Sequence, residues 1–222
     1  MHLFLPQRCL VCGRAGMQLC AECGDALPRL APPLCERCGA PTAWPVRRCL
    51  ECSGRRLGFA QARAAVVYDD SVRRLVAGWK ERGLRRLGDD AAGLVAECVE
   101  RPDAVLVAFV PADPRRLGER GHHPAERLAN ALAERWGMSC EPLLRRAGRS
   151  RRQRGLTLAE RRRNVAGAFA ATRSVSGSVL LVDDVYTSGA TVSAAASALR
   201  AAGASRVDVV TFARTIRLRR AT

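Results

Sequence analysis

The sequence predicts an α/β fold, a mainly parallel sheet with helices on both faces, preceded by a small cysteine-rich zinc-binding domain. Two observations support this prediction. From Phe59 onward, short apolar runs alternate with amphipathic stretches, as expected for parallel strands joined by right-handed helical crossovers. Before that point, eight of the ten cysteines stand among several prolines without convincing hydrophobic periodicity. The predicted domains are therefore residues 1–57 and 58–222.

The middle of the chain is expected to form two strands and three helices. A strand is predicted at 62–68, an amphipathic helix at 71–83 and a second helix at about 85–100. The continuous apolar run 104–111 ends at a proline, which is typical of a buried strand. The helix predicted at 124–137 has a proline in its first turn and a glycine at its end.

The remaining elements continue this alternation. A short strand is predicted at 139–144 and a helix at 159–169. A strand at 179–185, a helix at 190–203 and a strand at 206–214 follow. In open sheets of this kind, ligands bind at the carboxyl ends of the strands, and the two ends of interest follow Val110 and Val182.

Composition and charge narrow the functional classes. With 26% charged and 48% hydrophobic residues, the chain is expected to be globular and not disordered. No apolar stretch approaches the roughly 20 residues of a membrane span, and the start lacks the apolar core of a signal peptide. We therefore expect a cytoplasmic protein that is not an integral membrane protein. The net charge of +16 favours polyanionic partners, and Lys80 is the only lysine among many arginines.

Eight cysteines form four C-x2-C pairs: Cys9/Cys12, Cys20/Cys23, Cys35/Cys38 and Cys49/Cys52. Two such pairs complete a tetrahedral site of four sulfurs, which suits Zn²⁺, and closed sites of this type are structural. Sequential pairing is favoured, with Cys9, Cys12, Cys20 and Cys23 on one ion and Cys35, Cys38, Cys49 and Cys52 on the other. An interleaved arrangement stays open at this point. A redox role would explain one pair but not four. Cys98 and Cys140 are expected to be buried apolar fillers.

The run VLLVDDVYTSGATV, residues 179–192, predicts a binding site for a sugar phosphate. Its strand is expected to end on two adjacent carboxylates, Asp183 and Asp184, which can accept hydrogen bonds from the vicinal hydroxyls of a ribose and help to hold Mg²⁺. The small residues that follow let backbone N–H groups approach an anion, and the next helix points its positive end at the same place. Three hydroxyls add donors: Thr187, Ser188 and Thr191.

This stretch is similar to the signature of type I phosphoribosyltransferases, which binds the 5′-phosphate and ribose of phosphoribosyl pyrophosphate (PRPP). The whole layout resembles the ComF family, which includes late-competence and GntX-like proteins. The cysteine pairs are followed by WKERG, then VPADPRRLGERGHHPAERLA, then QRGLTLAERRRNVAGAF and finally the PRPP motif. The resemblance spans nearly the full chain and implies a phosphoribosyltransferase-like second domain that binds PRPP with Mg²⁺.

The resemblance also implies roles for individual residues. Asp183 and Asp184 would be the catalytic residues that hold the ribose hydroxyls. The 5′-phosphate would be wrapped by Thr187, Ser188, Gly189, Ala190 and Thr191. The loop from Pro111 to Arg120 would face the pyrophosphate, with Arg115, Arg116 and Arg120 as charge partners. Lys80 is a further candidate for a phosphate contact, or else a surface lysine.

One stretch departs from the family pattern. The family often shows R-G-F-N-Q where this chain continues from Arg120-Gly121 into two histidines and a proline. His122 could donate to an anion in place of the missing side chains, or it is a partly exposed loop residue. The densest basic run, 145–154, continues toward Arg161, Arg162 and Asn164. It could cover the reaction centre, hold a polynucleotide, or be a solvated loop.

Two main functions remain open at this stage. The first is a PRPP-binding protein of the ComF type that acts in natural competence, handling single-stranded DNA with the competence machinery at the inner face of the membrane. The second is an active phosphoribosyltransferase that transfers ribose 5-phosphate from PRPP to an unidentified acceptor, without a role in DNA uptake. A zinc-ribbon adaptor that only senses PRPP is a third.

Overall fold

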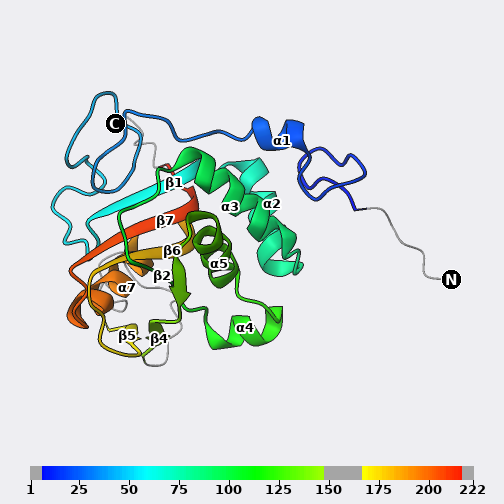
Figure 1. Ribbon diagram of the computed structural model, residues 1–222. Coiled ribbons are helices and arrows are strands. Elements are labelled where there is room, and N and C mark those ends of the chain that lie inside the picture. Colours follow the sequence, from blue (N-terminus) through cyan, green and yellow to red (C-terminus); the bar gives the residue numbers. More distant parts are fainter. Residues whose placement is uncertain (1–6, 148–166, 217–222) are drawn as a thin grey trace, which may run out of the picture.

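The computed structural model describes residues 7–147 and 167–216, and a five-stranded sheet lies at its centre (Figure 1). The strand order is β1-β7-β6-β2-β3, and every pair of neighbours is parallel. The strands are β1 (Gln61–Val67), β2 (Leu106–Phe109), β3 (Ser139–Glu141), β6 (Ser178–Tyr186) and β7 (Arg206–Arg214). The prediction of a mainly parallel sheet is confirmed.

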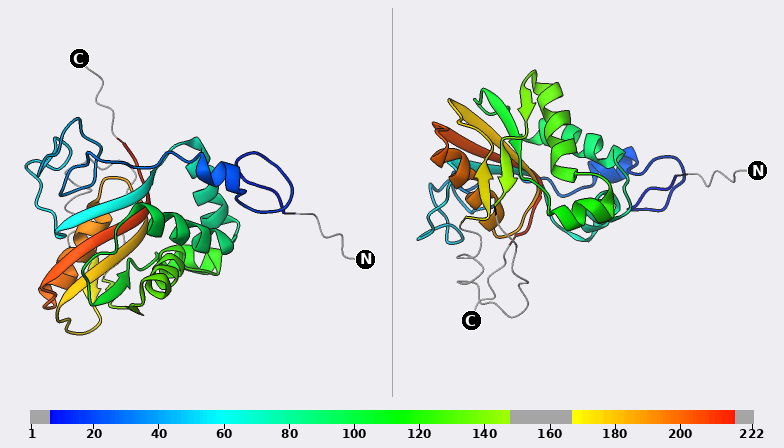
Figure 2. Two further views of the ribbon diagram at one scale, coloured as in Figure 1. Left: turned by 45° about the horizontal axis from the view of Figure 1, so that its top comes forward. Right: turned by 90° about the horizontal axis from the view of Figure 1, so that it is seen from below.

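Helices cover both faces of this sheet, as predicted (Figure 2). One face carries α2 (Asp70–Glu81), α3 (Arg86–Cys98) and α5 (Pro124–Trp136). The other face carries α7 (Ala190–Ala201) and an antiparallel hairpin of β4 (Leu144–Arg146) and β5 (Phe169–Ala171). Two short helices are α1 (Ala21–Asp25) and α4 (Pro114–Arg120). In the described parts of the chain, every helix is too short or too polar to cross a membrane.

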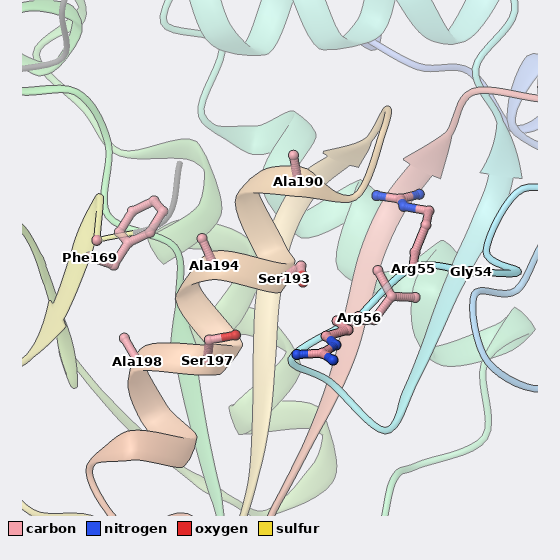
Figure 3. A pocket seen from close by; sticks show the side chains of 11 residues that line it. Gly54, Arg55, Arg56, Phe169, Ala190, Ser193, Ala194, Ser197 and Ala198 are labelled. Atoms are coloured by element: carbon pink, nitrogen blue, oxygen red, sulfur yellow. The ribbon is translucent and has the colours of Figure 1, made fainter. Parts of the chain in front are cut away.

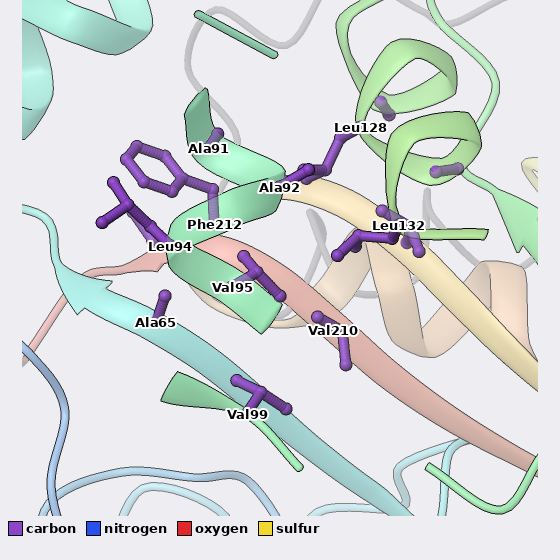
Figure 4. Close-up of a cluster of buried hydrophobic side chains, with 14 of the residues drawn as sticks. Ala65, Ala91, Ala92, Leu94, Val95, Val99, Leu128, Leu132, Val210 and Phe212 are labelled. Atoms are coloured by element: carbon purple, nitrogen blue, oxygen red, sulfur yellow. The ribbon is translucent and has the colours of Figure 1, made fainter. Parts of the chain in front are cut away.

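Alternate side chains of the central strands pack in two separate hydrophobic cores, one on each face of the sheet. On the α3 and α5 face, Val95, Leu128 and Leu132 pack with Val210 of β7 (Figure 4). On the opposite face, Leu199 of α7 packs in a second cluster with residues of β6 and β7. Because successive strand side chains point to opposite faces, a strand must be apolar on both sides to be buried in this way. This explains the unbroken apolar runs in the sequence.

The cysteine-rich region crosses the edge of the sheet from one face to the other. Its first part places Leu19 and Leu27 in the core on the α2 and α3 side. The connector, residues 28–30, then runs antiparallel along the edge strand β1: the Leu30 N–H donates to the Ala65 carbonyl at 2.9 Å, and the Val67 N–H donates to the Pro28 carbonyl at 2.8 Å. The buried cysteines that follow join the α7 core: Cys35, Cys38 and Cys52. The two cysteine groups thus lie on opposite faces.

The strand connections diverge between β2 and β6, and the region at the carboxyl ends of these two strands is called the crevice below. From β2 the chain continues through α5 to β3, whereas from β6 it continues through α7 to β7 on the other side. The carboxyl ends of two adjacent strands whose connections diverge flank the usual ligand site of such a sheet. The Val110 N–H still donates to the Val182 carbonyl at 3.0 Å. The two strand ends of interest in the sequence are therefore neighbours.

Several predicted boundaries were wrong. The stretch 139–144 is not one strand, because β3 ends at Glu141 and β4 begins a separate hairpin at Leu144. Residues 159–166 of the predicted helix lie outside the described residues, and Phe169 begins a strand. The expected loop 111–120 contains α4, which starts after the N-cap Asp113 with Pro114 in its first turn. Cys98 and Cys140 are half-buried, not buried.

Candidate functional site

The acidic pair lies on β6 where that strand loses one of its two neighbours. The pairing of β6 with β2 ends at Val182, opposite Phe109, whereas its pairing with β7 continues to Tyr186. The strand predicted at 179–185 is therefore one residue longer at each end, and Asp183 and Asp184 lie inside it. The physical reason is that β7 extends as far as Tyr186 does, whereas β2 is shorter. As a result the carboxylates face the crevice from within a strand that is held on one side.

A lysine and a backbone amide fix the two carboxylates. Lys80, in the last turn of α2, places its Nζ 2.7 Å from Oδ1 of Asp184, and the two side chains are only 24% and 14% exposed. The Asp184 N–H donates to Oδ1 of Asp183 at 2.9 Å. Lys80 is thus not a free surface lysine, because it is ion-paired inside the crevice. Its predicted contact with a phosphate stays a prediction.

Burial changes the protonation of Asp183. Burial, and then the adjacent Asp184, raise the pKa of Asp183 to about 8, whereas the positive charges of Lys80 and Arg146 act in the opposite direction. At neutral pH the unliganded site therefore carries a proton that it would release to a cation. Perturbed carboxylates in a crevice are a recurring property of binding and catalytic sites.

The turn after the acidic pair has the form of an anion-binding loop. Residues 187–191, called the phosphate loop after the ligand predicted for them, lead into the first turn of the twelve-residue helix α7. Gly189 has φ +70°, and a Cβ atom there would lie 2.2 Å from the Tyr186 hydroxyl, so only glycine fits. The Ala190 N–H donates to Oγ of Ser188 at 3.3 Å, and Thr187 and Thr191 are exposed. Backbone N–H groups at a helix start attract anions.

The arginines predicted for the pyrophosphate lie on α4 and not on a loop. Arg115 and Arg116 are exposed and Arg120 is half-exposed. Within residues 7–147 and 167–216, their guanidinium groups have no hydrogen bond or ion pair. Their role toward a ligand stays a prediction.

The two histidines after α4 have backbone partners. The ring nitrogens of His122 lie 2.7 Å from the Trp79 carbonyl and 3.0 Å from the Arg120 carbonyl, so the half-buried ring ties the end of α4 to α2. His123 caps α5 by accepting from the Glu126 N–H at 3.1 Å, and burial lowers the pKa of His123. Both rings are held in place by the fold.

Two arginines reach this site without having been singled out by the sequence. Arg146 donates from Nε to the Pro111 carbonyl at 3.1 Å, and its charge lowers the pKa of Asp183 in part. Arg55 donates from Nη2 to the Ser188 carbonyl at 2.6 Å. Arg146 belongs to the basic run 145–154, in which the sequence alone does not distinguish one arginine from another. For Arg55 the sequence offered no signal, because the contact spans 133 residues.

A cavity lies beside the phosphate loop, on the outer side of α7 (Figure 3). Its volume is about 570 Å³, and it separates residues 54–57 from the helix. Arg55 and Arg56 form one wall, Ser193 and Ser197 the floor, and Phe169 of β5 the other wall. The cavity shares Ala190 with the phosphate loop but does not include the acidic pair.

The eight paired cysteines form two clusters that fit zinc. In each cluster the four Sγ atoms lie within 4.8 Å of one another, and the members are Cys9, Cys12, Cys20 and Cys23 in the first cluster and Cys35, Cys38, Cys49 and Cys52 in the second. Sequential pairing is confirmed and interleaved pairing is wrong. Four thiolates around one point, with two from each knuckle, are the ligands of a closed structural Zn²⁺ site.

The thiols of each cluster differ in protonation. Burial alone would raise the pKa of Cys9, but backbone N–H groups, first that of Cys12, lower it to about 6. In the second cluster burial is likewise opposed at Cys35, whose pKa falls to about 7. A hydrogen bond that the Cys23 thiol donates to Cys20 raises the pKa of Cys23 to about 12, and burial raises the pKa of Cys52 to about 11. Only a cation in each cluster would make four thiolates stable together.

We expect the two clusters to bind zinc independently. Cys12→Ser removes one ligand from the first cluster and Cys49→Ser removes one from the second. Since no sulfur is shared, each variant should hold one zinc ion per chain where the unmodified protein holds two. Metal analysis of the purified full chain by mass spectrometry measures this. A single variant that lost both ions would contradict independent sites.

Comparisons with known proteins match this layout. Residues 1–55 match the family described as "Double zinc ribbon domain". Over 96% of this chain, the sequence is 27% identical to the whole of "DNA utilization protein YhgH" of Salmonella typhimurium and 26% identical to the whole of "Competence protein F" of Haemophilus influenzae. It is 25% identical to "Competence protein ComFC" of Streptococcus pneumoniae, over 87% of this chain and 86% of that protein.

Solved structures give weaker matches. The glutamine PRPP amidotransferase of B. subtilis, complexed with ADP and GMP, is 26% identical over 57% of this chain and 25% of that chain, with a TM-score of 0.38. The protein TT1426 of Thermus thermophilus is 21% identical over 64% of this chain and 86% of that chain, with a TM-score of 0.34. These low scores carry no weight here, whereas the sequence matches cover almost the full chain. By sequence, the chain is thus similar over most of its length to ComF-type competence and DNA utilization proteins, and its first 55 residues match the double zinc ribbon family.

Proposed function

We propose that the protein binds PRPP with Mg²⁺ in the crevice between β2 and β6, and that it acts in the cytoplasm in the handling of single-stranded DNA during natural competence. One observation carries this proposal. Two carboxylates lie in the crevice directly before a glycine-centred turn at the start of a long helix. A ribose monophosphate needs these two kinds of partner, acceptors for its hydroxyls and N–H donors for its phosphate, at this separation along the chain.

Each part of the ligand would meet a defined group. The ribose hydroxyls would donate to Asp183 and Asp184, and the 5′-phosphate would accept from the amides of the phosphate loop. Lys80 already holds Asp184 at 2.7 Å and would keep a positive charge beside the incoming anion. The metal, once bound, would neutralise the pyrophosphate and occupy carboxylate oxygens. The arginines of α4 would approach from the end of β2.

The DNA role is supported by the relatives and by the charge. Proteins similar to this chain over most of its length carry the names competence protein and DNA utilization protein. A net charge of +16 favours an acidic polymer as partner. The densest basic run begins at Arg145 and Arg146 on β4 and continues beyond the described residues.

An active phosphoribosyltransferase is the second candidate. It is favoured by the cations that surround the acidic pair, Lys80 and Arg146, because the departing pyrophosphate develops negative charge. Release of pyrophosphate on mixing with Mg²⁺-PRPP and a set of nucleobases would support turnover. If PRPP binds but pyrophosphate is not released with any of these bases, PRPP is a ligand of the protein and not its substrate.

Loss of the acidic pair should abolish PRPP binding without unfolding the chain. The double variant Asp183→Asn with Asp184→Asn keeps the side-chain size and removes both ionisable groups from the crevice. We expect affinity for Mg²⁺-PRPP to fall by at least about 100-fold, because two charge-assisted contacts are lost. Isothermal titration calorimetry measures the affinity, and circular dichroism checks the fold. Unchanged affinity would overturn the site assignment.

The raised pKa of Asp183 predicts a pH dependence with a definite sign. The carboxyl ionises at about 8 in the folded chain and near 3.8 when unfolded. Because Mg²⁺-PRPP requires the charged form, affinity should rise about fivefold between pH 7 and pH 8, reach about ten times its pH 7 value by pH 9 and level off above that. Calorimetry in buffers of different ionisation enthalpy should detect one released proton. Affinity that is constant from pH 7 to pH 9 would refute this account.

The same shift affects the unliganded protein. The folded state binds more protons than the unfolded state between pH 4 and pH 8, so this group contributes stability that is lost as pH rises through that range. Asp183→Asn removes the titration and should melt at a higher temperature than the unmodified protein at pH 8.5. A melting temperature that fell on this substitution would show that the carboxylate stabilises the fold.

Binding of single-stranded DNA should weaken steeply with salt. Each neutralised phosphate of a single strand contributes a slope of about −0.7 in the plot of log affinity against log salt. Fluorescence anisotropy of a labelled oligonucleotide between 50 and 300 mM NaCl measures the slope, with a peptide nucleic acid of the same sequence as an uncharged control. Affinity indifferent to salt, or equal for both polymers, would remove the electrostatic basis of this role.

A further inference from the structure

We propose that the second cysteine cluster sets the shape of the phosphate loop, and that Arg55 and Arg214 are the positioning residues that connect them. The proposal depends on the proposed function only for the identity of the ligand. The contacts of Arg55 and Arg214 that connect the cluster to the loop are present without a ligand. The proposal predicts that loss of metal from the second cluster disturbs the loop, although none of these cysteines belongs to the loop.

The first connection runs through Arg55. This residue follows Cys52 by three positions and is half-buried. Its guanidinium donates to the Ser188 carbonyl at 2.6 Å and to the Glu51 carbonyl at 3.4 Å. One side chain therefore bridges the last cysteine knuckle and the middle of the phosphate loop.

The second connection runs through Arg214 at the end of β7. Its guanidinium, 1% exposed as a residue, donates to Oε2 of Glu51 at 2.8 Å and to the Cys38 carbonyl. Its Cζ also lies 4.7 Å from the centre of the Tyr186 ring. The hydroxyl of that ring is buried, has no hydrogen-bond partner among the described residues, and lies against Gly189. A buried charge held from two sides leaves the ring and the glycine little freedom to move.

The linker, residues 55–58, follows the second cysteine cluster. It is hydrogen-bonded at both ends and borders a cavity between them. At one end Arg55 bonds the loop, and at the other the Gly58 N–H donates to Oγ of Ser193 on α7 at 3.0 Å. Between them lies the cavity of about 570 Å³ (Figure 3). Leu57 of this linker is buried in the α7 core, but Arg55 borders the cavity, and its hydrogen bond to Ser188 is the contact that joins the linker to the loop.

The first cysteine cluster is a natural control. It lies on the other face of the sheet, where Leu10 packs at Gly78 of α2 and Arg74 donates to the Val11 carbonyl at 3.1 Å. Among the described residues, none of the hydrogen bonds joins residues 7–27 to the phosphate loop. Loss of metal from this cluster should therefore leave the loop unchanged.

Adjacent arginines provide the first test. Arg56 has the same chemistry as Arg55 but is exposed and does not bond the loop in the described structure. With full-length, zinc-loaded protein and no ligand, Arg55→Ala should accelerate hydrogen exchange in a peptide spanning 187–191, Arg55→Lys should restore most of the protection, and Arg56→Ala should change nothing. Affinity for Mg²⁺-PRPP should fall about tenfold for Arg55→Ala only. Equal effects at the two positions would overturn the proposal.

Metal removal provides the second test. Cys49→Ser and Cys12→Ser should each lose one zinc ion, but only Cys49→Ser should accelerate exchange in 187–191. Equal exchange in both variants would refute the coupling. If Cys49→Ser does not fold, the Arg55 series decides alone. If the exchange results hold but the unmodified protein does not bind Mg²⁺-PRPP, the coupling stands and the ligand assignment fails. If PRPP binds and exchange is unaffected by Arg55→Ala, the coupling fails.

Discussion

The unequal length of the two neighbours of β6 is the constraint on which the site depends. β7 pairs with β6 as far as Tyr186, whereas β2 stops opposite Val182. A strand supported on one side only can be rigid and still present polar side chains to a crevice. Asp183 and Asp184 occupy these positions, and the turn that follows is held because Tyr186 is still in the sheet. A longer β2 would cover the carboxylates with backbone.

The arrangement of charges at the site lowers the stability of the unliganded protein. Two adjacent carboxylates are placed where burial raises the pKa of Asp183, and Lys80, which is ion-paired with Asp184, offsets this effect only in part. Groups placed for a ligand commonly lower the stability of the empty fold in this way. The zinc clusters counterbalance this locally, because metal binding contributes free energy to folding. The second cluster does so within the same core as α7.

Much of the fold was predictable because its signals are local. Apolar runs marked the strands, and the spacing of cysteines marked the pairs. The acidic pair and its turn are likewise contiguous. α4 was missed although Asp113-Pro114 is a helix start, because seven residues rich in arginine give little periodicity. The contacts of Arg55, Arg146 and Arg214 were unpredictable from sequence, since each depends on which strands become neighbours.

The connector 28–30 has a consequence for the sheet as a whole. A parallel sheet ends in strands whose outer amides and carbonyls are available to other chains. Here the outer side of β1 is occupied by an antiparallel strap from the cysteine-rich region, and the opposite border, β3, is only three residues long. The cysteine-rich segment thus shields the outer edge of β1 from pairing with a strand of another chain, in addition to contributing side chains to both cores.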